Sequence, residues 1–203
     1  MSEFIQQVIN GLSLGAIYAL IALGYTMVYG ILKFINFAHG EIFMLGAFSG
    51  FYIARLLGFN ESSIIGALII LMLSMTTCAL IGVTIEKLAY KPLRSASKLT
   101  VLITAIGVSL FLQYTGQLVF GADPKSFPTL LTNVNFKIAG ANIGSNQIVV
   151  IVSSIVLMFG LREIVMRTKI GTAIRAVSNN LTAASLMGIN INNVISFTFV
   201  LGS

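Results

Sequence analysis

The stretch TKIGTAIRAVSNNLTAASLMGININN, Thr168 to Asn193, is the longest polar-tolerant interruption in a chain that is otherwise almost continuously apolar. Apolar residues recur through it at helical spacing and form one stripe: Ile170, Ile174, Val177, Leu181 and Ala184. Asn180 can cap a second short helix by accepting a backbone N–H, and Gly188 suits the left-handed residue that ends it. We therefore predict two short helices with a break, lying at the membrane surface between two spans.

The stretch 168–193 has two interpretations. It is either a stiff, half-apolar knob that a soluble, energy-supplying partner pushes, or an amphipathic linker that rests on lipid headgroups. The sequence pattern alone favours neither interpretation over the other.

The composition indicates an integral membrane protein. Of the 203 residues, 57% are hydrophobic and 9% are charged, and the mean hydropathy is +0.97. Soluble domains carry roughly 25% charged residues. The net charge of +6 does not indicate a nucleic-acid partner, because basic residues of membrane proteins gather in cytoplasmic loops. Cys78 is the single cysteine, so no disulfide forms within the chain.

The apolar runs predict an all-α, polytopic membrane protein with about five spans and a truncated sixth. Each predicted span has about the 20 residues that a bilayer requires: Phe4–Gly30, Gly40–Phe59, Ser63–Ile85, Leu99–Phe120 and Gln147–Val165. Val194–Ser203 is apolar but too short to cross. Since lipid does not tolerate a half-crossed irregular backbone, we expect residues 1–203 to be one transmembrane domain and the N-terminal fragment of a longer chain. Otherwise these residues pack against a partner.

The distribution of basic residues predicts that the N-terminus lies outside. With five alternating spans, the inside then holds nine basic residues: Lys33, Lys87, Lys91, Arg94, Lys98, Arg162, Arg167, Lys169 and Arg175. The outside holds three: Arg55, Lys125 and Lys137. This bias agrees with the positive-inside rule, and it places the 87–98 loop and the 168–193 stretch in the cytoplasm. The long loop 121–146 lies on the other side, where VNFKIAG (134–140) could form a strand of a hairpin.

Small residues predict close helix packing at two GxxxG pairs, Gly11 with Gly15 and Gly46 with Gly50. The fourth predicted span carries Ser109, Gln113 and Gln117 at one-turn intervals. These three either line a polar path or bond to a neighbouring helix, and we favour the second.

Polar residues cluster between the first two predicted spans. Asn36, His39, Gly40 and Glu41 lie there beside apolar runs. One interpretation is an ordinary turn followed by a helix with an acidic first-turn residue. The other is a discontinuous helix whose four residues border a substrate pathway, as in many transporters. His39 and Glu41 are too few ligands for a metal site.

Three segments resemble one family. GYTMVYGILKFINFAHGEIFMLGAF (24–48) resembles the signature of permease subunits of branched-chain amino acid ABC importers. GTAIRAVSNNLTAASLMGI (171–189) is similar to that family's cytoplasmic coupling segment, and EKLAYKPLR (86–94) is similar to a further part of it. Related permeases for urea and short amides share much of this pattern.

The resemblance implies an ATPase-coupling role for one set of residues in the 168–193 stretch: Gly171, Ile174, Arg175, Ala183, Ala184 and Gly188. The general importer loop reads Glu-Ala-Ala, three residues, Gly, and here Thr182 stands where the Glu would be. The downstream Leu-Pro is also missing. A simple salt bridge to the ATPase is therefore not expected from this loop, and Arg175 is a candidate for supplying charge instead.

The resemblance further implies a multi-pass permease of the bacterial inner membrane. Its partners would be the lipid bilayer, a second permease subunit, two cytoplasmic ATPase subunits and a periplasmic protein that delivers leucine, isoleucine or valine. The chain carries no GxxxxGK[ST] phosphate loop, so we expect that it does not hydrolyse ATP itself. The resemblance implies no enzyme activity, no catalytic residue and no bound cofactor, with ATP used by the partners. The alternatives are an ion-coupled transporter or channel, for which only Glu41 is a candidate relay, and a non-transporting scaffold.

Overall fold

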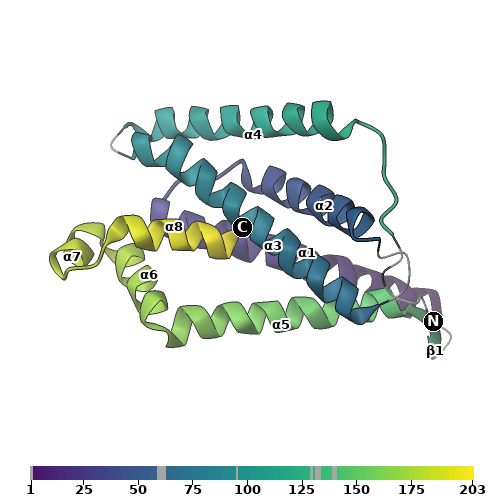
Figure 1. Ribbon diagram of the computed structural model, residues 1–203. Helices are drawn as coiled ribbons and strands as arrows, with labels where there is room; N and C mark the ends of the chain where they lie inside the picture. The colour runs from purple at the N-terminus through teal and green to yellow at the C-terminus, as the bar shows by residue number, and fades with distance from the viewer. Residues whose placement is uncertain (1, 59–62, 95, 129, 131–133, 139–140) are drawn as a thin grey trace.

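The computed structural model describes residues 2–58, 63–94, 96–128, 130, 134–138 and 141–203. Within these ranges the chain is an elongated bundle of helices with one small hairpin (Figure 1). The long helices are α1 (Ser2–Leu32), α2 (His39–Leu56), α3 (Ile64–Ile85), α4 (Lys98–Phe120) and α5 (Ser145–Arg167). The shorter ones are α6 (Lys169–Asn179), α7 (Leu181–Leu186) and α8 (Ile191–Gly202).

Four helical segments are long and apolar enough to cross a membrane, which confirms the predicted all-α polytopic class. Among the described residues these are Glu3–Leu32, Ile64–Leu93, Lys98–Phe120 and Ser145–Arg167. The predicted second span corresponds to α2, whose 18 residues include Glu41 in the first turn and Arg55 in the last. Helix α2 is not one of the four. The predicted end of that span, Phe59, lies outside the described residues.

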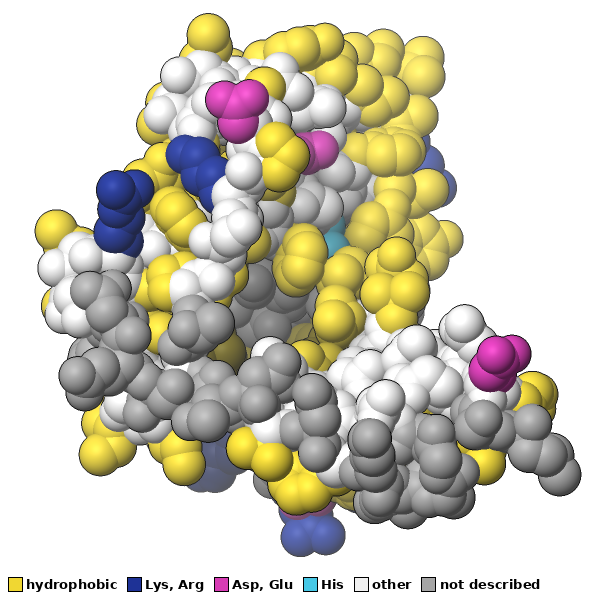
Figure 2. Space-filling view, turned by 90° about the vertical axis from the view of Figure 1, so that its right-hand side faces the viewer, with side chains coloured by type: hydrophobic (Ala, Val, Ile, Leu, Met, Phe, Trp, Pro, Cys, Tyr) yellow, Lys and Arg dark blue, Asp and Glu magenta, His cyan; other side chains and the backbone are white. Residues whose placement is uncertain are grey.

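Large hydrophobic side chains cover much of the outer surface of the bundle. Phe4, Leu12, Ile64 and Leu118 each expose more than half of their surface, and Figure 2 shows such side chains along one flank of the end that carries the N-terminus. A helix that is apolar all round needs an apolar environment. The exposed side chains therefore fit a protein surrounded by lipid.

The predicted loop after the third span is partly wrong, because the helix continues beyond Ile85. A π-helical turn, η1 (Glu86–Tyr90), follows α3, and a 3₁₀ turn, η2 (Lys91–Leu93), follows η1. Pro92 in η2 has no N–H to donate, which prevents a regular α-helical continuation. Helix α4 then begins after Ser97, whose Oγ accepts a hydrogen bond from the backbone N–H of Thr100 at 3.2 Å.

Helix α8 packs inside the bundle against α1 and α3. Its residues Val194, Ile195 and Phe199 are buried. The backbones of α1 and α8 meet closely at Gly24, where an added Cβ would collide with the carbonyl oxygen of Gly202. The apolar residues 194–203 thus find their partners within this chain, and packing against another protein is not needed to explain them.

The two glycine pairs differ in their surroundings. A Cβ added at Gly46 would collide with the Sγ of Cys78 on α3, and one added at Gly50 would lie 2.8 Å from the Oγ of Ser74. At Gly11 and Gly15, in contrast, an added Cβ would meet nothing within 4 Å. The second pair therefore packs α2 on α3, while the predicted packing at the first pair is not found among the described residues of this chain.

The two ends of the bundle are built differently. Figure 1 shows α6, α7 and the connection between α3 and α4 at one end, and the N-terminus and β1 at the other. Strands β1 (Asn135–Ile138) and β2 (Ala141–Gly144) pair antiparallel, with Asn135 opposite Gly144. The predicted strand in VNFKIAG is confirmed as β1, and residues 139–140 lie outside the described ranges. The two segments expected in the cytoplasm thus share one end, termed here the basic end.

Candidate functional site

Helices α6 and α7 form at the basic end as the sequence predicts. The Oγ1 of Thr168 accepts a hydrogen bond from the backbone N–H of Gly171 at 3.0 Å and caps α6. The Oδ1 of Asn180 accepts one from the N–H of Ala183 at 3.0 Å and caps α7. Gly188 ends the segment with a φ of 82°, the left-handed conformation that glycine adopts without steric cost. The predicted two helices, break and end are confirmed.

Half of the predicted coupling residues face the interior of the protein. Ile174 and Ala184 are buried together with Val177 and belong to the same apolar core as α8. Gly171 is buried at the corner between α5 and α6, where an added Cβ would collide with the carbonyl oxygens of Ile164 and Val165. These residues fix the segment to the bundle and are not available to a soluble partner.

The outward face of the segment is an apolar tip made by Leu181, Leu186 and Met187. Leu186 and Met187 each expose 82% of their surface, and Leu181 exposes 42%, although the predicted stripe placed Leu181 inside. Leu186 and Met187 were not identified from the sequence because they fall off that stripe. Their position directly before Gly188 was the available signal. The tip is therefore an apolar surface that faces away from the bundle.

The remaining predicted coupling residues, Arg175 and Ala183, are exposed. Arg175 turns back toward the α5–α6 corner, where its Nη2 donates to the carbonyl oxygen of Met166 and to Thr172 Oγ1, both at 3.3 Å. Its charge lies on the outer surface of α6. The segment therefore presents an apolar tip on α7 and two exposed cations on α6, Lys169 and Arg175.

The predicted pathway residues between α1 and α2 contact three different elements. Asn36 is buried, and its Oδ1 accepts a hydrogen bond from the Tyr90 hydroxyl of η1 at 2.7 Å. The Nε2 of His39 lies 3.2 Å from the carbonyl oxygen of Ile21 on α1. Glu41 accepts a hydrogen bond from Ser109 on α4 at 3.3 Å. The structure therefore does not gather these side chains around one cavity, and Gly40 beside them is exposed.

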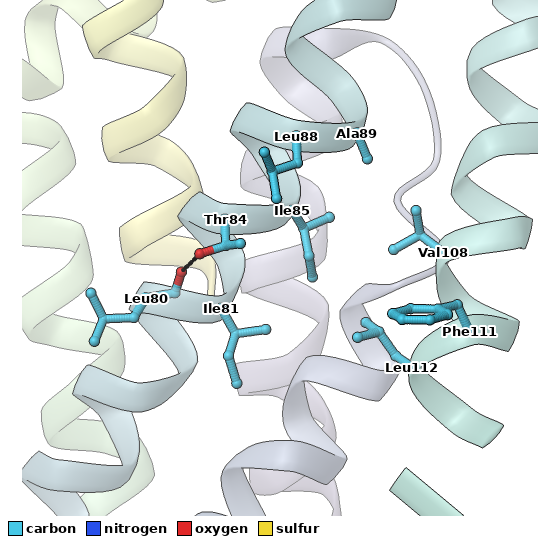
Figure 3. A pocket seen from close by; sticks show the side chains of 9 residues that line it. All are labelled: Leu80, Ile81, Thr84, Ile85, Leu88, Ala89, Val108, Phe111 and Leu112. Carbon is cyan, nitrogen blue, oxygen red and sulfur yellow. Dashed lines mark hydrogen bonds between the residues drawn. The ribbon is translucent and has the colours of Figure 1, made fainter. Parts of the chain in front are cut away.

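The polar face predicted on α4 is divided. Ser109 bonds to the neighbouring helix α2 through Glu41, as the favoured interpretation expects. Gln113 and Gln117 are exposed. A groove of about 350 Å³ lies between α3 and α4 (Figure 3), but apolar side chains line it, and its one hydroxyl, on Thr84, donates to the carbonyl oxygen of Leu80 at 2.8 Å. The groove lacks the convergent polar groups that a zwitterion requires.

A buried ion pair between Glu86 of η1 and Arg94, just after η2, was not predicted from the sequence. The Glu86 side chain is 0% exposed and pairs with Arg94. Its Oε2 also accepts a hydrogen bond from the hydroxyl of Ser196 on α8 at 2.7 Å. The Nη1 of Arg94 donates to the Oδ1 of Asn192, again on α8, at 2.5 Å. The pair thus joins the end of α3 to α8. The signal was present in the spacing of one acid and one arginine around Pro92.

Replacing Tyr90 with phenylalanine is expected to destabilise the fold by about 1–3 kcal/mol, because the buried Oδ1 of Asn36 loses its donor. The thermal unfolding midpoint of the purified protein in detergent measures this. Tyr114→Phe is the matched control, since that side chain is 59% exposed on α4. Equal midpoints for the two variants would show that water or another group satisfies Asn36.

Together, the apolar helices and the protruding α6–α7 segment define a polytopic α-helical membrane protein. A family model described as the permease component of branched-chain amino acid transport systems matches residues 7–203. The chain belongs to this family. No solved structure matches it.

Relatives in the family are similar over almost the whole chain. BraD of Pseudomonas aeruginosa, a high-affinity branched-chain amino acid transport system permease protein, is 42% identical over 208 residues, covering 99% of this chain and 67% of the relative. LivH of Escherichia coli, with the same description, is 38% identical over 216 residues, covering 98% of this chain and 67% of the relative. A probable branched-chain amino acid transport permease, LivH of Methanocaldococcus jannaschii, is 28% identical over 191 residues, covering 90% of this chain and 57% of the relative.

Proposed function

We propose that this chain is the transmembrane permease subunit of an ATP-driven importer, which moves leucine, isoleucine and valine from a periplasmic binding protein to the cytoplasm. Family membership over residues 7–203 is the observation that carries the proposal. The names of the relatives supply the substrate class, since they are described as branched-chain amino acid permeases. The relatives are permease proteins, and the proposed chain is likewise a transport subunit and no enzyme.

The exposed surfaces of the molecule support the proposed partners. Two ATPase subunits would use ATP and dock on the apolar tip of Leu181, Leu186 and Met187. A second permease subunit and lipid would cover the exposed apolar flanks (Figure 2). Because the chain has no phosphate loop, ATP would be used by the partner subunits.

The proposed location is the bacterial inner membrane, with the N-terminus outside. The asymmetry of the basic residues supports this orientation, because cytoplasmic loops collect Lys and Arg. The basic end in Figure 1 would then face the cytoplasm and the ATPase. Asn36, His39, Gly40 and Glu41 remain the proposed border of the substrate pathway, supported by the hydrogen bonds of the three polar side chains to η1, α1 and α4.

The importer is tested with the complete complex in cells, using Gly188→Val and the matched control Gly188→Asn. Valine is strained at the φ of 82° at this position, whereas asparagine tolerates it. We expect leucine uptake to fall about tenfold in the valine variant, from roughly 1–3 kcal/mol of backbone strain, and to stay close to wild type in the asparagine variant.

Uptake of labelled leucine is compared at equal membrane abundance, with labelled urea as a second substrate. Wild-type uptake of urea without leucine would contradict the proposed substrate and favour the amide permeases. Full leucine uptake by Gly188→Val would show that residues 168–193 are a linker and take no part in coupling.

A further inference from the structure

The buried ion pair Glu86–Arg94 lies between the two regions that the proposed importer must connect. On one side it holds α8 through Ser196 and Asn192, which are four residues apart and so lie on one face of that helix. On the other side Glu86 shares the π-helical turn η1 with Tyr90.

Helix α8 is joined to α6 and α7 by packing and by the chain itself. Ile174, Val177 and Ala184 belong to the same apolar core as Val194 and Phe199 of α8. The chain passes from Gly188 directly into α8, which Asn190 caps by accepting from the backbone N–H of Asn193 at 3.3 Å. A displacement of α6 and α7 therefore displaces α8.

The turn η1 continues this connection to the segment between α1 and α2. The hydroxyl of Tyr90 donates to Asn36 at 2.7 Å, and the ring of Tyr90 lies 5.8 Å from that of Phe199 on α8. Asn36 is the first of the residues proposed to border the pathway. Contacts thus run without a gap from the coupling segment through α8 and η1 to the α1–α2 connection.

Two physical properties suit Glu86 to this position. A buried carboxylate that loses its cation is left uncompensated in a medium of low dielectric constant, so Glu86 and Arg94 must move together. A π-helical turn is rare and is frequently found at functional sites. It has a discrete alternative, the ordinary α-helical turn, and a change between the two would shift Tyr90 relative to α3.

From this contact path we infer that Glu86 is a positioning residue of the importer: its ion pair with Arg94 transmits the movement of α6 and α7, through α8, to the α1–α2 connection. The inference rests on the proposed function. Glu86 acts through Arg94, Ser196 and Tyr90 and does not contact the transported molecule.

The test measures leucine transported per ATP hydrolysed by the complete importer in proteoliposomes. Glu86→Gln removes the charge, and Ser196→Ala removes one hydrogen bond while leaving the ion pair intact. The matched control is Glu163→Gln, because Glu163 forms an exposed ion pair with Arg167 at 2.9 Å on α5. We expect the ratio to fall about tenfold in Glu86→Gln and about threefold in Ser196→Ala, and to stay at the wild-type value in the control.

The outcomes separate this inference from the proposed function. A wild-type importer that transports no branched-chain amino acid contradicts the proposed function and with it the inference. A wild-type importer that transports leucine, with unchanged ratios in the variants, overturns the inference alone. If the Glu86→Gln variant does not accumulate in the membrane, the ratio of leucine transported to ATP hydrolysed in Ser196→Ala tests the inference instead. A lower unfolding midpoint with a wild-type ratio in that variant would assign the network a purely structural role.

Discussion

Replacing Gly171 with alanine is expected to remove most of the folded protein from the membrane. The chain turns at this corner, where α5 ends at Arg167 and α6 begins at Lys169. A Cβ at Gly171 would collide with the carbonyl oxygens of Ile164 and Val165, which are backbone atoms of α5. Backbone atoms cannot relieve the collision by a change of rotamer, so α6 must move away from α5. We expect a loss of about 3 kcal/mol, at the upper end of the cost of overpacking.

Membrane abundance and the thermal unfolding midpoint in detergent measure this effect. Gly160→Ala is the matched control, because an added Cβ at that position on α5 meets nothing within 4 Å. The control should match the wild type or exceed it slightly, since alanine favours a helix over glycine by about 1 kcal/mol. If Gly171→Ala is as stable as the wild type, the corner between α5 and α6 can relax around the added methyl group. Gly171 would then not be needed for packing and would again be a candidate coupling residue.

Replacing Leu186 with aspartate is expected to abolish binding of the ATPase while leaving the permease folded. The side chain is 82% exposed at the tip of α7, so its loss removes little internal packing. A hot-spot residue at the centre of an interface contributes about 2 kcal/mol or more, and we expect Leu186 to be one. A carboxylate there would also have to be desolvated. We expect the affinity to fall about thirtyfold or more and leucine uptake to disappear.

Co-purification of the ATPase with the permease, and uptake at equal membrane abundance, test this expectation. Thr182→Glu is the control on the same helix. It adds the same charge at an exposed position, where the general importer loop carries a glutamate. If Leu186→Asp retains the ATPase, the apolar tip is not the docking surface, and the exposed face of α6 with Arg175 becomes the alternative.

The coupling segment was largely predictable because its determinants are local. The cap at Asn180, the left-handed Gly188 and the stripe through Ile174 and Val177 each involve residues a few positions apart. Leu181 was misplaced for a related reason. The helix breaks at Asn180, so a stripe counted through the break no longer follows one face.

The ion pair of Glu86 was not predictable from local patterns. Its hydrogen-bond partner Ser196 is 110 residues away in the chain, and only the docking of α8 into the bundle removes the carboxylate from water. When the packing of α8 is not known, the sequence after Ile85 predicts only an ordinary basic loop. The same limit applies to Asn36 and Glu41. Their clustering was visible in the sequence, but the directions of their side chains depend on Tyr90 and Ser109 on distant elements.

The packing of Cys78 between α2 and α3 has a practical use. This is the single thiol of the chain; its Sγ lies 3.6 Å from the carbonyl oxygen of Ile42, and the absence of a side chain at Gly46 makes room for it. A buried sulfur is shielded from water-soluble maleimides. Cys78 therefore need not be replaced before single cysteines are introduced for accessibility mapping, because only the introduced thiol would be labelled. Each introduced cysteine then reports its own side of the bilayer, and the α2–α3 contact is left unchanged.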